Sequence, residues 1–106
     1  MALEDYLMPS EEVRFHSSFG VHYGKKTYHA VLTDRRILLY AKRGAFFKND
    51  DIVIQKISDL QGIKYQEDGL INRRGTIKIL GARSEMDLWG SATEVKALYQ
   101  QMMQFM

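Results

Sequence analysis

The chain has 106 residues, a hydrophobic fraction of 45%, a charged fraction of 26% and no cysteine. This length suits one domain with a core of its own, and the lack of cysteine excludes disulfides, thiolate catalysis and cysteine-ligated zinc. The formal net charge is +2, too balanced for the dominant basic surface of a typical nucleic-acid-binding protein. No apolar run approaches the ~18 residues of a membrane-spanning helix. The first ten residues lack the basic region of a secretory signal, so we expect a cytoplasmic protein or domain.

The first ten residues differ from the rest of the chain. They contain the only proline, Pro9, and the residue before a proline disfavours helix. The preceding ALEDYL has room for one or two helical turns. We therefore divide the chain into an N-terminal segment, 1–10, and one domain, 11–106.

Between Glu12 and Trp89, short segments with β periodicity alternate with turn residues. In VRFHSSF, for example, Val13, Phe15 and Phe19 alternate with polar residues, which is typical of a strand. The predicted strands span 13–19, 26–33, 36–43, 51–57, 62–67, 75–81 and 84–89. About seven short strands at this spacing indicate an antiparallel sandwich or barrel.

The last 17 residues, GSATEVKALYQQMMQFM, change to a helical period. Ser91 with Glu94 three residues later has the form of a capping box. Val95, Leu98 and Met102 recur on one side, so we expect an amphipathic helix that caps the barrel. Its methionines form an adaptable surface that could also serve a dimer.

Three stretches carry a family resemblance: AVLTDRRILLY (30–40), RGAFFK (43–48) and IQKISDLQGI (54–63). Together with the order of seven strands and one helix, they resemble the prokaryotic PH-like domains of the pleckstrin-homology superfamily, and are similar to the related GRAM domains. The resemblance covers 11–106. It implies a mainly β fold, with about seven antiparallel strands in two orthogonal sheets capped by the C-terminal helix. Members of the superfamily bind phosphoinositides, peptides or proteins, and some form oligomers.

The basic residues that hold phosphoinositides in this superfamily are only partly present. The usual arrangement is a lysine late in the first strand and an arginine pair in the second. Here the first strand ends in SSFG, and the second begins with Lys25 and Lys26 and no arginine. Specific inositol-phosphate recognition is therefore not expected.

Two segments between predicted strands are unusually apolar. KRGAFFKND (42–50) contains two adjacent phenylalanines, which either contact a membrane or partner, or fold back so that one covers the barrel edge. SFGVHYGKKT (18–27) is either an apolar loop or the continuation of a bent strand with glycines at bulges. If both lie at one end of the barrel, they form one candidate interaction patch: Phe19, Val21, Tyr23, Lys25, Lys26, Arg43, Phe46, Phe47 and Lys48.

Two pairs of arginines are further candidates. Arg73 and Arg74 fall in the hairpin NRRG, where they form either a weak phosphate or nucleic-acid contact or, more commonly, a solvated tip. Arg35 and Arg36 begin the third predicted strand. We expect them to pair with carboxylates such as Asp34, Glu85 or Asp87 rather than with a ligand.

No catalytic or cofactor motif is present. The three histidines, His16, His22 and His29, do not have the spacing of a helical metal site. Cross-strand pairing of His16 and His29 could make only a weak metal site. No nucleophile elbow, phosphate-binding loop or dinucleotide fingerprint occurs.

The sequence therefore predicts a non-enzymatic binding module without a cofactor. The leading hypothesis is protein interaction or self-association, by addition of a partner strand to an open sheet edge. The alternative is peripheral binding to anionic membrane lipids through the basic and aromatic loops.

Overall fold

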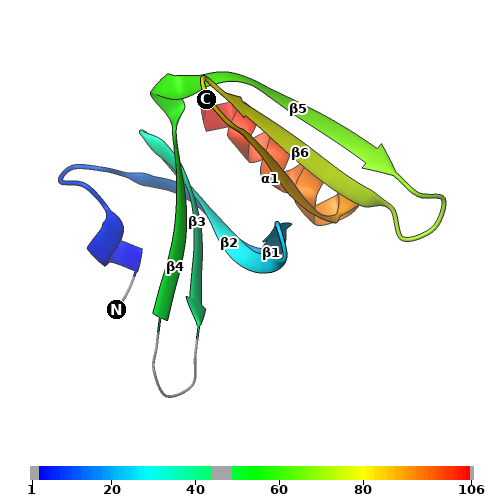
Figure 1. Cartoon of the computed structure of the whole chain (residues 1–106), viewed down its shortest axis with the longest axis horizontal. Coiled ribbons are helices and arrows are strands. Elements are labelled where there is room, and N and C mark those ends of the chain that lie inside the picture. Colours follow the sequence, from blue (N-terminus) through cyan, green and yellow to red (C-terminus); the bar gives the residue numbers. More distant parts are fainter. Residues whose placement is uncertain (1–2, 44–48, 106) are drawn as a thin grey trace.

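The computed structural model describes residues 3–43 and 49–105 and shows a mainly β chain with one C-terminal helix (Figure 1). The seven strands are β1 (Val13–Tyr23), β2 (Lys26–Thr33), β3 (Arg36–Arg43), β4 (Asn49–Lys56), β5 (Leu60–Asp68), β6 (Arg74–Gly81) and β7 (Glu85–Ser91). The helices are the 3-10 turns η1 (Leu3–Tyr6) and η2 (Ile57–Asp59) and the α-helix α1 (Ala92–Phe105). The prediction of seven strands followed along the chain by one terminal helix is confirmed.

All seven strands belong to one antiparallel sheet in the order β4-β3-β2-β1-β7-β6-β5. Consecutive strands pair along most of their length. The junction between β1 and β7 is different, because the only register pair recorded there is His22 with Trp89. The sheet is therefore two well-paired halves joined through one narrow contact.

Strand β1 is longer than predicted, and this settles one alternative left open above. The stretch from Phe19 to Tyr23 continues the strand, with a register irregularity between His16 and Gly20. Ser17 occupies this irregularity: its hydroxyl donates to the Phe19 carbonyl at 2.8 Å and accepts from the Ala30 N–H at 2.9 Å. The turn is only Gly24 and Lys25, with Gly24 at φ +62°, as a tight two-residue hairpin turn requires.

The main core lies between the inner face of the sheet and α1. The helix buries Val95, Leu98 and Met102, as its period predicts, and it packs mainly on β6, β7 and β1. On β2 and β3 the inward residues alternate, as they must in a strand. The buried core residues are Val21, Tyr28, Ala30, Leu32, Ile37, Leu39, Ala41, Ile77, Ile79, Met86, Leu88, Val95, Leu98 and Met102.

The first turn of α1 crosses β6 very closely at Gly75. A Cβ at this position would lie 2.9 Å from the Tyr65 hydroxyl, 3.1 Å from Val95 Cβ and 3.2 Å from Ala92 Cα. The Ala92 N–H also donates to the Arg73 carbonyl at 3.0 Å. Glycine at position 75 therefore lets the start of the helix dock against the β5–β6 hairpin.

A second apolar layer covers the outer face of the other half of the sheet. Val31 and Leu38 are fully buried although neither belongs to the main core. They lie opposite each other in register, on the face that alternation turns outward. Tyr40 shares this face of β3 with Leu38, and the ring of Tyr6 lies 6.0 Å from it. The N-terminal segment therefore folds back over β2 and β3.

A buried ion pair holds the N-terminal segment in this position. The Glu11 carboxylate is fully buried and accepts from Arg36 Nε at 2.9 Å and from the Thr33 hydroxyl at 2.6 Å. Arg36 Nη2 also donates to the Tyr6 carbonyl at 2.7 Å. Arg36 therefore pairs with a carboxylate, as expected, but the partners suggested for it, Asp34, Glu85 and Asp87, are wrong. Glu85 and Asp87 contact Lys78 instead.

The same contacts make Glu11 a strong acid. The hydrogen bond from Arg36 is the main reason that its pKa falls from 4.5 to about 2, although burial opposes the shift. A carboxyl whose pKa is lowered by folding stabilises the folded state above its ordinary pKa, and this contribution disappears as the pH falls through the lowered value.

None of the helices found in 3–43 and 49–105 is long and apolar enough to cross a bilayer.

The first prediction concerns Gly75. The change Gly75→Ala should lower the free energy of unfolding by about 1 to 3 kcal/mol, because the added methyl group overpacks the contact between β6 and α1. Gly62→Ala is the control, since a Cβ there meets only Leu80 at an ordinary 3.7 Å. Urea unfolding measures both variants, and equal effects would contradict the close approach.

The second prediction concerns the Glu11–Arg36 pair. Glu11→Gln should lower the free energy of unfolding at pH 7 by about 3 kcal/mol, because it leaves a buried guanidinium without its counter-ion. The loss of unfolding free energy relative to the wild type should have its full size above pH 4.5. It should shrink toward zero as the pH falls to about 2 and the Glu11 carboxylate becomes protonated.

Glu12→Gln is the matched control, because Glu12 is exposed and forms only a surface pair with Arg14 at 3.5 Å. Its stability should stay within about 0.5 kcal/mol of the wild type. Urea unfolding across this pH range measures both variants. If the loss of stability caused by Glu11→Gln does not change with pH, the lowered pKa of Glu11 would be contradicted.

Candidate interaction surfaces

The structure breaks up the interaction patch that the sequence suggested. Phe19, Val21 and Tyr23 form one inward row on β1: Val21 is fully buried, and the two aromatic rings are partly buried against the core. Val21 was therefore wrongly assigned to the surface. Its alternation with polar residues reflects a strand with one face in the core.

The basic residues of the first hairpin remain at the surface, but one of them is paired. Lys25 is exposed in the turn. Lys26 Nζ lies 3.2 Å from Asp51 Oδ2 on β4, and the same carboxylate oxygen accepts from the Tyr28 hydroxyl at 3.0 Å. Among the other members of the patch, Arg43 ends β3, and Phe46, Phe47 and Lys48 lie outside the described residues.

The sheet has two outer edges, β4 and β5, and they differ in how open they are. Strand β5 carries a register irregularity between Leu60 and Gly62, and its exposed side chains are polar. Strand β4 pairs with β3 in continuous register from Asn49 to Lys56. Ile52 and Ile54 face outward on β4, and Ile54 is 47% exposed. A regular edge with an exposed aliphatic side chain is an open template for strand addition.

The two arginines of the β5–β6 hairpin are exposed, as expected of a solvated tip, but both also contact the protein. Arg73 donates to the Gly69 carbonyl at 2.6 Å and lies 3.3 Å from a Glu67 carboxylate oxygen. The guanidinium of Arg74 lies 4.8 Å from the centre of the Trp89 ring. Both arginines therefore contact the protein, and the end of the hairpin carries Leu70 and Ile71, which are 98% and 83% exposed.

Sequence reasoning overlooked these two aliphatic residues. The predicted strands 62–67 and 75–81 correctly implied a turn between them, and Gly69 and Asn72 in that turn have positive φ angles of 99° and 53°. The sequence did contain a signal for them, because two apolar residues within the turn between these strands must point away from the sheet.

A network of polar side chains lies at the base of this hairpin. Glu67 accepts from the Tyr65 hydroxyl at 2.8 Å and from Lys96 Nζ at 2.8 Å, and the ring of Tyr65 stacks on Tyr99 at 5.2 Å. The hydrogen bond from Lys96 is the main reason that the pKa of Glu67 is lowered to about 2. Burial, followed by Glu67, raises the pKa of Tyr65 to about 12. This network fixes β5 to α1.

The outer face of the sheet carries an aromatic stack at the β1–β7 junction. The His22 and Trp89 rings stack at 4.2 Å, and His22 Nδ1 lies 3.1 Å from the Thr27 hydroxyl. The rings of His16 and His29 also meet, edge to face, at 5.9 Å. Within the described part of the chain, no group of three or more His, Cys, Asp or Glu residues could hold a metal ion.

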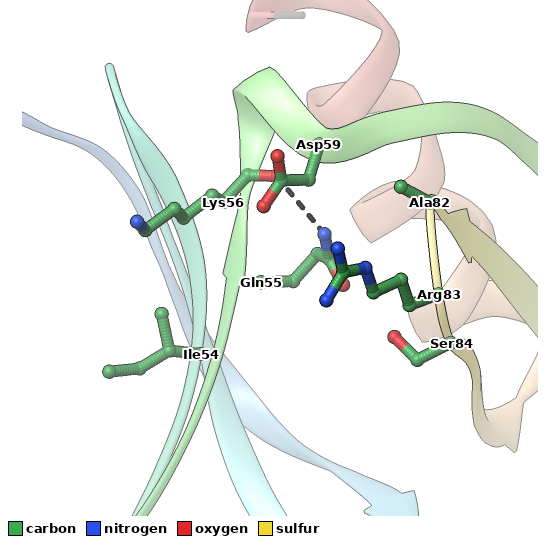
Figure 2. Close-up of a pocket in the computed structure, with 7 residues that line it drawn as sticks. All are labelled: Ile54, Gln55, Lys56, Asp59, Ala82, Arg83 and Ser84. Atoms are coloured by element: carbon green, nitrogen blue, oxygen red, sulfur yellow. Dashed lines mark hydrogen bonds between the residues drawn. The ribbon is translucent and has the colours of Figure 1, made fainter.

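A hollow of about 610 Å³ opens between the end of β4 and the β6–β7 turn (Figure 2). It is lined by Ile54, Gln55, Lys56, Asp59, Ala82, Arg83 and Ser84. Gln55 is buried and donates to the Lys56 carbonyl at 3.1 Å. Figure 2 shows the Lys56 side chain pointing away from the guanidinium of Arg83, so the two cations do not converge on a common anion position.

Comparison of the chain with protein-family models, with curated proteins and with solved structures found no match.

The third prediction tests the network around Glu67. Glu67→Gln should lower the pKa of Tyr65 below about 12, because it removes the negative charge beside the phenol. Because burial is the larger cause, the pKa should stay above the ordinary value of 10.0. Absorbance titration of the phenolate measures this value, and Tyr65→Phe in each background identifies the contribution of Tyr65. An unchanged titration would contradict the contact.

Because the pKa of Tyr65 is raised by folding, its contribution to stability is present below pH 10.0 and is lost as the pH rises toward 12. The wild type should therefore lose more stability than Tyr65→Phe over this interval.

Proposed function

We propose that this chain is a non-enzymatic binding module of the PH-like type, and that it acts by protein interaction, in the first instance by self-association through β4. The family assignment rests on the sequence resemblance given above. The strand order, with a single register pair between β1 and β7 and a helix after β7, supports it.

The two halves of the sheet also support the description as two crossed layers. In Figure 1, β3 and β4 run steeply across the direction of β5 and β6, and α1 lies against the second half. A single register pair at the β1–β7 junction is what two layers with one shared corner require.

The observation that carries the functional proposal is the open edge of β4. All eight residues of β4 pair with β3, and no further strand flanks β4 among the residues that the structure describes. The backbone N–H and C=O groups along this edge can therefore pair with an added strand, while the outward Ile54 supplies apolar contact area.

A second copy of the chain is the simplest partner for this edge. Two β4 strands related by a two-fold axis run antiparallel, and each presents the same edge to the other. Two-fold symmetry of this kind is the commonest symmetry of homodimers. Ile52 and Ile54 of the two copies then share one outer face. Continuous pairing of the two β4 edges creates one sheet through the dimer.

The lipid alternative takes second place. It relied on an apolar and basic patch, and three apolar members of that patch, Phe19, Val21 and Tyr23, pack in or against the core. What remains of it in the described residues is Lys25, the paired Lys26 and Arg43 at the end of β3.

The fourth prediction tests the β4 edge. The wild type should show concentration-dependent dimerisation by sedimentation equilibrium, and Ile54→Lys should weaken it at least about tenfold, because it places a charge where two edges meet. Leu80→Lys is the matched control. Leu80 is an exposed aliphatic residue, 37% accessible, but it lies on β6, an interior strand.

A wild-type chain that stays monomeric up to about 1 mM would contradict self-association. Equal weakening by both lysine substitutions would show that the association does not use the β4 edge. Hydrogen exchange adds a direct readout, since dimerisation by strand pairing should protect amides of β4 and leave those of β5 unchanged.

A further inference from the structure

The tip of the β5–β6 hairpin presents two aliphatic side chains to solvent with almost nothing around them. Leu70 is 98% exposed and Ile71 83%, whereas the next most exposed large apolar residue among those described, Met103, is 59% exposed. Figure 1 shows this hairpin extending beyond the start of α1, at the far end of the molecule from β4. Single exposed aliphatics are common on protein surfaces, but an adjacent pair at a protruding tip is not explained by packing.

The tip is held in this conformation by its own base. Gly69 and Asn72 adopt positive φ angles, and the Arg73 side chain spans the loop to the Gly69 carbonyl at 2.6 Å. The Ala92 N–H at the start of α1 donates to the Arg73 carbonyl at 3.0 Å. The loop is therefore pinned at its base to β5 and to the first turn of α1, so the two aliphatic side chains are presented outward at no cost in loop ordering.

Behind the two aliphatic side chains the hairpin carries two arginines, and then a tryptophan from the neighbouring strand. Arg73 and Arg74 come directly after the turn. Trp89 is level with Thr76 in the sheet, which places it about 7 Å further along the hairpin than Arg74 at the rise of a strand. The guanidinium of Arg74 lies over the Trp89 ring. Tryptophan favours the headgroup level of a membrane and long basic side chains also reach it, so both residue types suit a position behind two inserted aliphatic side chains.

The dimensions of the tip argue against a second copy as its partner. Two aliphatic side chains offer on the order of 200–300 Å² of apolar surface, whereas a stable protein interface needs about 800 Å² per partner. A convex tip also cannot be extended into a larger interface without the neighbouring charged residues. A lipid surface has no such requirement, because acyl chains surround an inserted side chain on all sides.

We propose that the β5–β6 hairpin inserts Leu70 and Ile71 into the interface of a phospholipid bilayer, with Arg73, Arg74 and Trp89 at the level of the headgroups. This contact uses a surface and a ligand class that differ from those of the β4 edge, and it goes beyond the function proposed above. Weak and reversible binding is expected, since a single short apolar contact does not anchor a protein stably.

The charge near the tip predicts how this binding responds to salt. Within 67–74, Glu67 and Asp68 balance Arg73 and Arg74, and the Lys96 ammonium adjoins Glu67. Attraction to an anionic surface is therefore small, and apolar insertion supplies most of the binding. Flotation should change little with salt, unlike binding through a basic patch.

The experiment combines flotation with a fluorescent label. Vesicles of phosphatidylcholine, with and without phosphatidylglycerol, are floated with the wild type at about 0.1 and about 0.5 M salt. The same vesicles are tested with Leu70→Ser/Ile71→Ser. The matched control is Leu80→Ser/Met103→Ser, which removes two exposed apolar side chains elsewhere. Because the chain has no cysteine, Leu70→Cys and Ala82→Cys each accept one environment-sensitive dye, at the tip and at the opposite end of β6.

The proposal expects partition of the wild type onto both kinds of vesicle, with little salt effect. The tip variant should lose about tenfold or more, since each buried aliphatic side chain is worth roughly that factor, and the control variant should bind as the wild type does. The dye at position 70 should shift to the blue on vesicles, and the dye at position 82 should not. Circular dichroism shows whether the tip variant keeps its fold, and its exposed side chains have no packing to lose.

Three outcomes would overturn the proposal. The first is the absence of both flotation and a dye shift at position 70. The second is flotation that survives in the tip variant and is lost in Phe46→Ser/Phe47→Ser, which would assign the membrane contact to the other loop. The third is a blue shift at position 70 that grows with protein concentration without vesicles, which would make the tip a protein contact. None of these outcomes depends on whether β4 dimerises, because sedimentation reports that separately.

Discussion

The structure depends on a sheet that bends without closing. One register pair, His22 with Trp89, joins β1 to β7, so each half of the sheet must be stabilised by what packs on it. On the inner side α1 supplies Val95, Leu98 and Met102 to a core that both halves share. The sheet stays open because β4 and β5 do not pair with each other, which leaves these two strands as its outer edges.

The N-terminal segment compensates for a second feature of this architecture. The outer face of β2 and β3 carries Val31 and Leu38, which an exposed sheet face would leave in water. The segment before β1 lies over this face, where the Tyr6 ring meets Tyr40. The Glu11–Arg36 pair fixes it there with further bonds to Thr33 and to the Tyr6 carbonyl. A buried ion pair adds little net stability compared with apolar packing, but losing one partner is strongly destabilising. Its effect here is to specify one position for this segment on the sheet.

Local patterns in the sequence predicted much of this fold, and contacts between distant residues account for what they missed. Alternation identified the strands, and the helical period identified the buried face of α1. Alternation could not show that Val31, on the outward face of β2, is buried, because the segment that lies over this face is more than twenty residues away. The partner of Arg36 was missed for the same reason: Glu11 is 25 residues distant.

The errors at the candidate surfaces have a different cause. The stretch SFGVHYGKKT (18–27) could be read as a loop because its two glycines weaken a strand signal, yet Gly20 continues the strand beyond a bulge that Ser17 fills. At the β5–β6 hairpin the turn was recognised and its arginines were noticed because charge suggests ligands. The informative residues were Leu70 and Ile71, since exposed aliphatic groups are the less expected observation at a turn.

The two proposed contacts lie on different parts of the molecule and can act together. Figure 1 places β4 and the β5–β6 tip far apart in the view, so pairing of β4 leaves the tip free. A dimer formed through β4 carries two tips. When the two-fold axis lies along the membrane normal, both tips reach the same bilayer, and the second insertion becomes intramolecular and gains from its effective concentration. When the axis lies in the membrane plane, only one tip of each dimer can insert, and binding stays as weak as that of the monomer. The orientation of the β4 pair therefore decides whether a weak apolar tip can become a lasting membrane contact.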